Sequence, residues 1–204
     1  MLQNLIQFFV IHSKDTEGNY EYLLQPSGYI ALVLLFALLL IVVSLSANNK
    51  ERRINTKQLV NASMAMALAM VTSFIKFASL PFGGSITLFS MFFICYIGYL
   101  YGPRIGIIAG IAYGILQLIT GPYIYHPLQL LLDYPLAFGA LGLSGFFYKK
   151  KHGLMIGCIV GMLGRYIFHV ISGYIYFSEH ALAGLTYSIT YNATYILPEL
   201  IATI

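Results

Sequence analysis

The feature that most constrains this chain is a series of long apolar runs that hold few charged residues. The run from Gly28 to Ala47 holds no charged side chain, and similar runs recur from residue 59 onward. An apolar helix of about 20 residues crosses the hydrocarbon core of a bilayer. Only 9% of the residues are charged and 59% are hydrophobic, whereas soluble domains are about 25% charged. A soluble enzyme is therefore excluded, and we predict an all-α, polytopic membrane helix bundle.

The apolar runs divide into seven predicted spans. They cover Gly28–Ala47, Leu59–Leu80, Ile86–Leu100, Ile105–Thr120, Pro127–Tyr148, Leu154–Phe177 and Leu185–Ile204. Residues 1–57 would form an exposed or interfacial tail, an extra N-terminal transmembrane helix and a basic loop. Residues 58–204 would form a six-helix membrane domain.

The basic residues predict how the helices are oriented. They gather at Lys50–Lys57, at Arg104 and at Lys149–Lys151, and alternating spans place these three segments on one side of the bilayer. Cytoplasmic loops carry an excess of Lys and Arg. We therefore expect a multi-pass protein of the plasma membrane with its N-terminus outside and its C-terminus in the cytoplasm. The net charge of +4 then reflects topology, and nucleic acid is not an expected partner.

Four charged side chains fall inside predicted spans: Lys76, Asp133, Arg165 and Glu199. A charge at the centre of a membrane helix costs about 2.5–3.5 kcal/mol on insertion scales, so each such residue suggests function. Lys76 lies near the outer end of its span and is expected to snorkel to the interface. Glu199 is expected to satisfy backbone donors or to meet a cytoplasmic partner, and no substrate role is assigned to it.

Polar residues from three spans are predicted to share one layer. At 1.5 Å per helical residue, Asp133, Asn192 and His169 lie about 9, 10 and 12 Å below the outer ends of their spans. Three helices that contribute polar groups at one depth can form a ligand pocket. Purely structural roles remain open as alternatives. His169 could be a packing histidine, and Asn192 could hydrogen-bond a neighbouring helix.

A spacing of four residues places one further set on a single face of the sixth span. This set is Arg165, His169, Gly173 and Phe177. Tyr134 and Tyr187 add aromatic rings near Asp133 and Asn192. A carboxylate surrounded by aromatic rings suits a small cationic or amino-bearing heteroaromatic ligand, although Asp133 and Arg165 could instead form a structural ion pair.

The sequence carries no catalytic, cofactor or metal motif. It lacks the nucleophile elbow, the zinc-protease helix and the ATP-binding Walker A loop. Cys95 and Cys158 lie singly inside apolar runs, which favours packing. We therefore predict a protein that is not an enzyme, needs no cofactor or metal and cannot hydrolyse ATP itself.

Small residues on the second span suggest a close helix contact. Ala65 and Ala69 are four residues apart, and such spacing lets two helix backbones approach in lipid. The partner could be another subunit or another helix of this chain, and the spacing leaves both open.

Four segments together resemble one family. They are Gly121–Phe138, Leu80–Leu88, Arg165–Gly173 and Tyr187–Asn192. Their shared motifs are an acidic-Tyr pair, a basic-xxx-His-xxx-Gly face and a Tyr-xxxx-Asn pair. The chain from Leu59 onward resembles the substrate-binding S-components of energy-coupling-factor (ECF) vitamin transporters, specifically the thiamine-specific members.

This resemblance implies a fold and a mechanism. Family members are six-helix bundles whose substrate pocket, near the outer surface, is capped by the loop between the first two helices. Asp133 would bind the aminopyrimidine side of thiamine. Further ligand-contact positions would be Tyr134, Arg165, His169, Gly173, Phe177, Tyr187 and Asn192. Ala65 and Ala69 would dock the shared transmembrane coupling subunit, which works with two ATPase subunits, and the S-component would topple in the membrane to release thiamine inward.

The chain departs from the family pattern in a few positions. It contains no Trp, and Phe177 occupies the face on which family members can stack thiamine on tryptophan. Asp133 and Arg165 stand where Glu and Lys can occur. A thiamine precursor is therefore an alternative ligand. A stand-alone secondary transporter for a small heteroaromatic cation is the alternative function, and it would need internal repeats and broken helices at the midplane.

Overall fold

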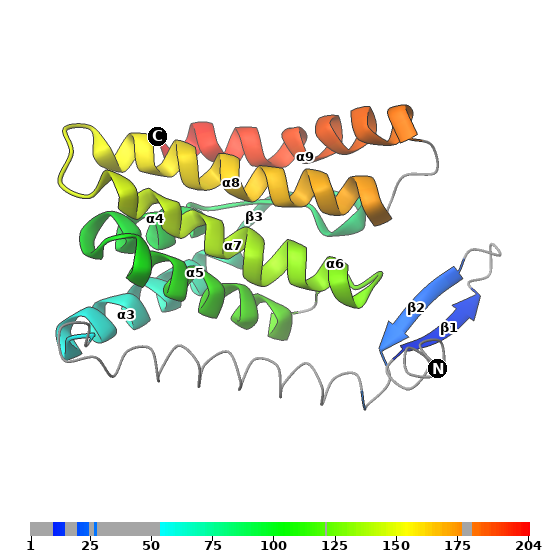
Figure 1. The fold of residues 1–204 in the computed structure, drawn as a ribbon, viewed down its shortest axis with the longest axis horizontal. Coiled ribbons are helices and arrows are strands. Elements are labelled where there is room, and N and C mark those ends of the chain that lie inside the picture. The colour runs from blue at the N-terminus through cyan, green and yellow to red at the C-terminus, as the bar shows by residue number, and fades with distance from the viewer. Residues whose placement is uncertain (1–9, 15–19, 25–26, 28–53, 121, 177–180) are drawn as a thin grey trace. The chain divides into compact units, whose positions relative to one another are not determined.

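The structure is a computed structural model that describes residues 10–14, 20–24, 27, 54–120, 122–176 and 181–204 (Figure 1). The predicted first span, Gly28–Ala47, lies outside the described residues, and so does Phe177. The chain divides into two compact units. One comprises Met1–Asn55 with Ile124–Pro127, and the other comprises Thr56–Tyr123 with Leu128–Ile204.

The first unit contains a β-hairpin within the segment expected to be a tail. Strands β1 (Val10–Lys14) and β2 (Tyr20–Leu24) pair antiparallel, with Val10 opposite Leu24 and Lys14 opposite Tyr20. Their aromatic and β-branched residues favour extended backbone. These strands contradict the all-α prediction. That prediction considered only apolar runs long enough for a membrane helix and did not consider short strands.

The second unit is a bundle of helices. Its regular α-helices are α3 (Thr56–Ser73), α4 (Ser90–Tyr101), α5 (Pro103–Gln117), α8 (Gly153–Tyr176) and α9 (Ala181–Thr203). A 3-10 turn, η3 (Leu118–Thr120), follows α5. Between α5 and α8 the chain forms α6 (Pro127–Leu131), the π-helix η4 (Leu132–Leu136), α7 (Ala137–Ala140) and the 3-10 helix η5 (Leu141–Phe147).

The predicted second span, Leu59–Leu80, is wrong at its C-terminal end. The helix ends at Ser73, and β3 (Lys76–Ser79) pairs antiparallel with β4 (Ser85–Thr87). A short 3-10 turn, η2 (Pro81–Gly83), joins the two strands. The β-branched and aromatic residues after Ser73 favour a strand, and the Pro-Phe-Gly-Gly sequence favours a turn.

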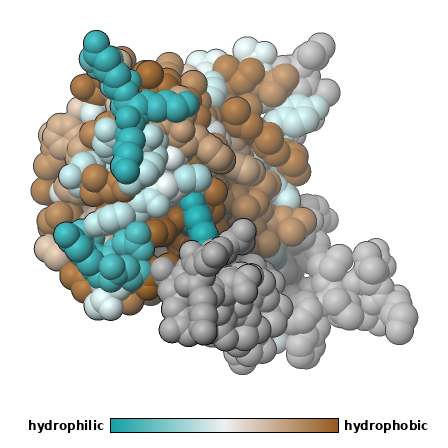
Figure 2. Space-filling model, turned by 60° about the vertical axis from the view of Figure 1, so that its left-hand side comes forward, coloured by the Kyte–Doolittle hydropathy of each residue, from teal (hydrophilic) through white to brown (hydrophobic). Residues whose placement is uncertain are grey.

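Three helical stretches among the described residues are long and apolar enough to cross a membrane. They are Pro103–Thr120, Pro127–Phe147 and Gly153–Tyr176, and α4 is a shorter apolar helix. Figure 2 shows that apolar side chains (brown) make up much of the visible surface, while hydrophilic ones (teal) project from limited areas. A surface of this kind suits contact with lipid rather than with water.

The basic segments of the described chain lie at one end of this unit. Lys57 opens α3, Arg104 opens α5, and Lys149–Lys151 join η5 to α8. Figure 1 shows these three points, together with the C-terminus, at the left end of the bundle. This shared end is the arrangement that alternating spans predict.

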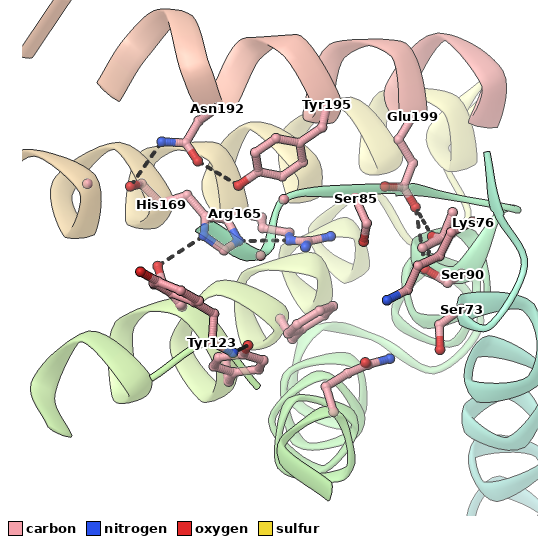
Figure 3. A pocket seen from close by; sticks show the side chains of 18 of the residues that line it. Ser73, Lys76, Ser85, Ser90, Tyr123, Arg165, His169, Asn192, Tyr195 and Glu199 are labelled. Atoms are coloured by element: carbon pink, nitrogen blue, oxygen red, sulfur yellow. Dashed lines mark hydrogen bonds and ion pairs between the residues drawn. The ribbon is translucent and has the colours of Figure 1, made fainter. Parts of the chain in front are cut away.

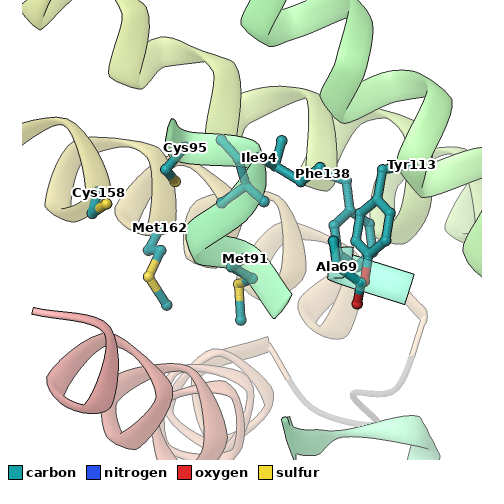
Figure 4. Packing of buried hydrophobic residues seen from close by; sticks show 9 residues of the cluster. Ala69, Met91, Ile94, Cys95, Tyr113, Phe138, Cys158 and Met162 are labelled. Atoms are coloured by element: carbon teal, nitrogen blue, oxygen red, sulfur yellow. The ribbon is translucent and has the colours of Figure 1, made fainter. Parts of the chain in front are cut away.

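The core of the bundle is formed by α4, α8 and their neighbours. Met91 of α4 and Met162 of α8 pack together in it, and Tyr113 of α5 makes an edge-to-face contact with Phe138 of α7 at 5.1 Å (Figure 4). Cys95 and Cys158 are buried in the same cluster as free thiols. Both cysteines therefore have the packing role that their isolation in the sequence predicts.

The small residues of α3 face this core. Ala65 and Ala69 are 6% and 0% exposed, and the backbone carbonyl of Ala69 accepts a hydrogen bond of 3.1 Å from the Tyr113 hydroxyl. Ala65 packs in a cluster with Ile97 of α4 and Ala109 of α5. Of the two contacts that their spacing left open, the structure shows the internal one.

Candidate functional site

A cavity of about 160 Å³ lies within the second unit, between the β3–β4 hairpin and helices α5, η4, α8 and α9. Seven of the predicted site residues line it. They are Asp133, Tyr134, Arg165, His169, Gly173, Tyr187 and Asn192. The structure thus brings together side chains from three separate helical stretches, as the depth count along the spans predicts.

Asp133 projects into the cavity from the π-helix. Pro135 lies within the same short stretch and has no backbone N–H to donate, which loosens the regular α-helical ladder. Wide turns of this kind recur at functional sites. The Oδ1 atom of Asp133 is 3.0 Å from Nδ1 of His169, and its Oδ2 atom accepts a hydrogen bond of 2.6 Å from the Gln129 side-chain amide. The carboxylate is therefore fixed by two partners.

Arg165 decides the tautomer of His169. Its Nε–H donates to Nε2 of His169 at 3.1 Å, so that ring nitrogen accepts. A neutral imidazole with an accepting Nε2 carries its proton on Nδ1, and Nδ1 then donates to Asp133. Figure 3 shows Arg165 hydrogen-bonded to His169. Arg165 also stacks on the ring of Phe138, 4.3 Å from its centroid, and donates to the sulfur of Met91. The guanidinium is thus held by contacts on several sides.

Asn192 joins α9 to α8 beside this chain of hydrogen bonds. Its amide nitrogen donates to the backbone carbonyl of His169 at 3.3 Å and to that of Ser188 at 2.9 Å. Its amide oxygen accepts a hydrogen bond of 2.5 Å from the Tyr195 hydroxyl. Asn192 therefore bonds a neighbouring helix and also lines the cavity, so both roles that the sequence allowed are present.

Gly173 lets α9 approach α8 at the same level. A Cβ atom at this position would lie 2.2 Å from the Ser188 hydroxyl oxygen and 3.4 Å from the Asn192 amide nitrogen. Ser188 itself donates to the carbonyl of Val170 at 2.9 Å. A side chain at position 173 would therefore displace the Ser188 hydroxyl from its place between the two helices.

Aromatic rings from α9 connect the cavity wall to the β3–β4 loop. Tyr187 stacks on Tyr191 at 6.0 Å, and Tyr191 meets Tyr195 edge-to-face at 5.8 Å. The Tyr191 hydroxyl accepts a hydrogen bond of 3.2 Å from the Gly84 N–H and donates to the carbonyl of Pro81. The Tyr191 hydroxyl therefore links the loop to α9 through two hydrogen bonds.

Gly84 makes this attachment possible. A Cβ atom on Gly84 would lie 2.8 Å from the Tyr191 oxygen and 2.9 Å from the Tyr195 ring. The loop backbone can therefore reach the tyrosines only without a side chain at this position.

Two charged residues of the cavity received no ligand role from the sequence. Lys76 was predicted to snorkel at the end of a helix, but it lies on strand β3 and lines the cavity. Glu199 also lines it, is 1% exposed, and accepts hydrogen bonds from the hydroxyls of Thr87 at 2.5 Å and Ser90 at 3.4 Å. The missed signal for Glu199 is its spacing, since Asn192, Tyr195 and Glu199 follow one another at three and four residues on one helix face.

Known proteins are similar to this chain over most of its length. The family model described as "Thiamine transporter protein" matches residues 59–204. The thiamine transporter ThiT of Bacillus subtilis is 36% identical over 163 residues, which cover 71% of this chain and 84% of that protein. ThiT of Lacticaseibacillus paracasei is 32% identical over 116 residues, covering 47% of this chain and 58% of that protein.

A solved structure has a similar fold. ThiT from Listeria monocytogenes matches with a TM-score of 0.61 and 26% identity, covering 72% of this chain and 88% of that chain. The matching proteins are named transporters rather than enzymes, and together with the apolar helices they identify a membrane protein. The resemblance seen in the sequence motifs is confirmed. The chain belongs to the thiamine transporter protein family.

Proposed function

We propose that this protein is the substrate-binding S-component of an ECF importer, which captures thiamine from outside and delivers it inward. The observation that carries the proposal is the polar network in the cavity. Asp133, His169 and Arg165 are joined by hydrogen bonds of 3.0 and 3.1 Å within apolar helices. Such groups are costly in a membrane, so their presence there points to a function.

The network suits the two chemical features of thiamine, an aminopyrimidine and a positively charged thiazolium ring. The Asp133 carboxylate would accept a hydrogen bond from the exocyclic amine. The tyrosine rings of α9 offer π faces for stacking and for cation–π attraction. The ligand contacts that we propose are Asp133, Tyr134, Arg165, His169, Gly173, Phe177, Tyr187 and Asn192.

ATP-driven transport would require partners, because the sequence has no ATP-binding motif. We infer a transmembrane coupling subunit and two ATPase subunits, with the N-terminus of this chain outside and its C-terminus in the cytoplasm. The docking role that the family resemblance implies for Ala65 and Ala69 stays a prediction, and within this chain both side chains are buried against neighbouring helices.

Thiamine titration tests the proposal. We expect saturable binding at micromolar thiamine or below, measured by calorimetry or by tyrosine fluorescence on monodisperse protein in detergent. Absence of binding at micromolar thiamine would overturn it. Co-purification with ATPase subunits would support the ECF assignment, whereas thiamine uptake by vesicles that lack any ATPase would support the stand-alone transporter.

Removing the Tyr191 hydroxyl should release bound thiamine faster. Tyr191→Phe keeps the stacked ring but loses both hydrogen bonds to the Pro81–Gly84 loop. Each such bond contributes about 1 kcal/mol, so we expect a dissociation rate about 5- to 20-fold higher, measured by chase with excess unlabelled thiamine.

Tyr166→Phe is the matched control for this experiment. It deletes a tyrosine hydroxyl that donates from α8 to the carbonyl of Ile189 at 2.9 Å and is not bonded to the loop. An equal acceleration in both variants, or none in Tyr191→Phe, would show that the loop attachment does not retain the ligand.

A further inference from the structure

The cavity contains a second carboxylate, Glu199, at some distance from Asp133. Glu199 follows Asn192 by seven residues on α9, which places it about 10 Å further along the helix axis. Figure 3 shows Arg165 between His169 on one side and Glu199 on the other. The two carboxylates therefore line different parts of the same cavity.

The two carboxylates differ in their partners. Asp133 is paired with His169 at 3.0 Å and with the Gln129 amide at 2.6 Å. Glu199 accepts hydrogen bonds from two neutral hydroxyls, those of Thr87 and Ser90. Among the described residues, Asp133 has a basic side chain within 4.0 Å, the His169 imidazole, whereas Glu199 has none.

Two cationic side chains line the same cavity, but neither pairs with Glu199. The Arg165 guanidinium is held by His169, by Met91 and by the face of Phe138. Lys76 lies on the exposed strand β3 and forms no ion pair with Glu199 within 4.0 Å. Burying a carboxylate without a counter-charge is costly. A ligand cation that entered this end of the cavity would supply the direct ion pair that Glu199 lacks.

We propose that Glu199 binds the positively charged ring of the ligand, while Asp133 binds its amine. This inference rests on the proposed function and identifies the ligand charge with the thiazolium of thiamine. Thr87 and Ser90 are positioning residues, since their hydroxyls fix the Oε1 atom of Glu199. Recognition is thus divided between two carboxylates, each matched to one half of a bipartite ligand.

The test compares thiamine with an uncharged analogue in which a thiophene ring replaces the thiazolium. Glu199→Gln keeps the side-chain shape and an acceptor for both hydroxyls, but it removes the charge. We expect it to weaken thiamine binding at least tenfold and to change binding of the uncharged analogue less than twofold. Asp133→Asn is the matched control, and it should weaken both ligands to a similar degree.

The outcomes separate this inference from the proposed function. Lack of thiamine binding by the unaltered protein would overturn the proposed function. If the unaltered protein binds thiamine, equal losses for both ligands in Glu199→Gln would overturn the role of Glu199. Equal affinity of the unaltered protein for thiamine and for the uncharged analogue would also overturn it, and this measurement requires no variant to fold.

Discussion

Replacing Asp133 with alanine is expected to weaken thiamine binding about 100-fold. The change removes the acceptor for the ligand amine and also leaves the His169 Nδ1–H and the Gln129 amide without the partners they have at 3.0 and 2.6 Å. A hydrogen bond to a charged group contributes about 1.5–3 kcal/mol, and each 1.4 kcal/mol is tenfold in affinity. Calorimetric titration of the variant measures the loss.

Asp133→Asn separates charge from shape in the same experiment. Asparagine retains one oxygen acceptor for His169, so it should lose less affinity than alanine does. Thermal melting of both variants without ligand shows whether the bundle persists. Affinity for thiamine within threefold of the unaltered protein, in an alanine variant that melts normally, would show that Asp133 does not contact the ligand.

The polar layer of the site was predictable because it depends on helical geometry alone. Counting 1.5 Å per residue along three predicted spans brought Asp133, His169 and Asn192 to one depth. In the structure Asp133 hydrogen-bonds His169, and Asn192 hydrogen-bonds the backbone of His169. A polar residue inside a long apolar run is a strong local signal, and its depth needs no knowledge of which helices are neighbours.

The β3–β4 hairpin was not predictable from the same pattern. Residues 74–80 are as apolar as the helix before them, so apolarity alone extends the span to Leu80. What ends the helix at Ser73 is the pairing of Lys76–Ser79 with Ser85–Thr87, a contact between separate segments. Lys76 thereby moves from a helix end to the wall of the cavity.

The residue spacing also could not predict which helices contact the small-residue face of α3. The spacing of Ala65 and Ala69 predicts a close helix contact, but a sequence pattern does not show whether the partner helix belongs to this chain or to another subunit. Within this chain their neighbours include α4 and α5, because both alanines are buried in clusters with residues of those helices. The prediction of a close contact is confirmed, while its location required the fold.

Substitution of Gly142 by valine is expected to prevent the bundle from folding. A Cβ atom at this position would lie 2.1 Å from the backbone nitrogen of Ile107 and 2.3 Å from the carbonyl carbon of Gly106. Both are backbone atoms of α5, so no side-chain rotation can relieve the clash. Helices in lipid associate through such close backbone contacts.

The same contact supports the binding site. Gly110 and Gly114 follow Gly106 at intervals of four on α5, and Cβ atoms there would meet the backbone oxygens of Phe138 at 2.3 Å and of Tyr134 at 2.6 Å. This glycine face holds α5 against the stretch that carries Asp133. Separating the two should therefore abolish thiamine binding together with folding.

Overpacking of a core costs about 1–3 kcal/mol where side chains can adjust. A clash with backbone atoms should cost more than about 3 kcal/mol. That cost is a large part of the free energy of unfolding of a typical protein, about 5–15 kcal/mol. Gly164→Ala is the control, since its Cβ would lie 3.1 Å from the side chains of Ala140 and Leu143 and in ordinary contact, at 3.8 Å, with the Ala140 carbonyl oxygen. We expect Gly164→Ala to elute as a single species and to bind thiamine, and Gly142→Val to aggregate after detergent extraction. A monodisperse Gly142→Val variant that binds thiamine normally would contradict the close approach of α5 to η5 on which the site depends.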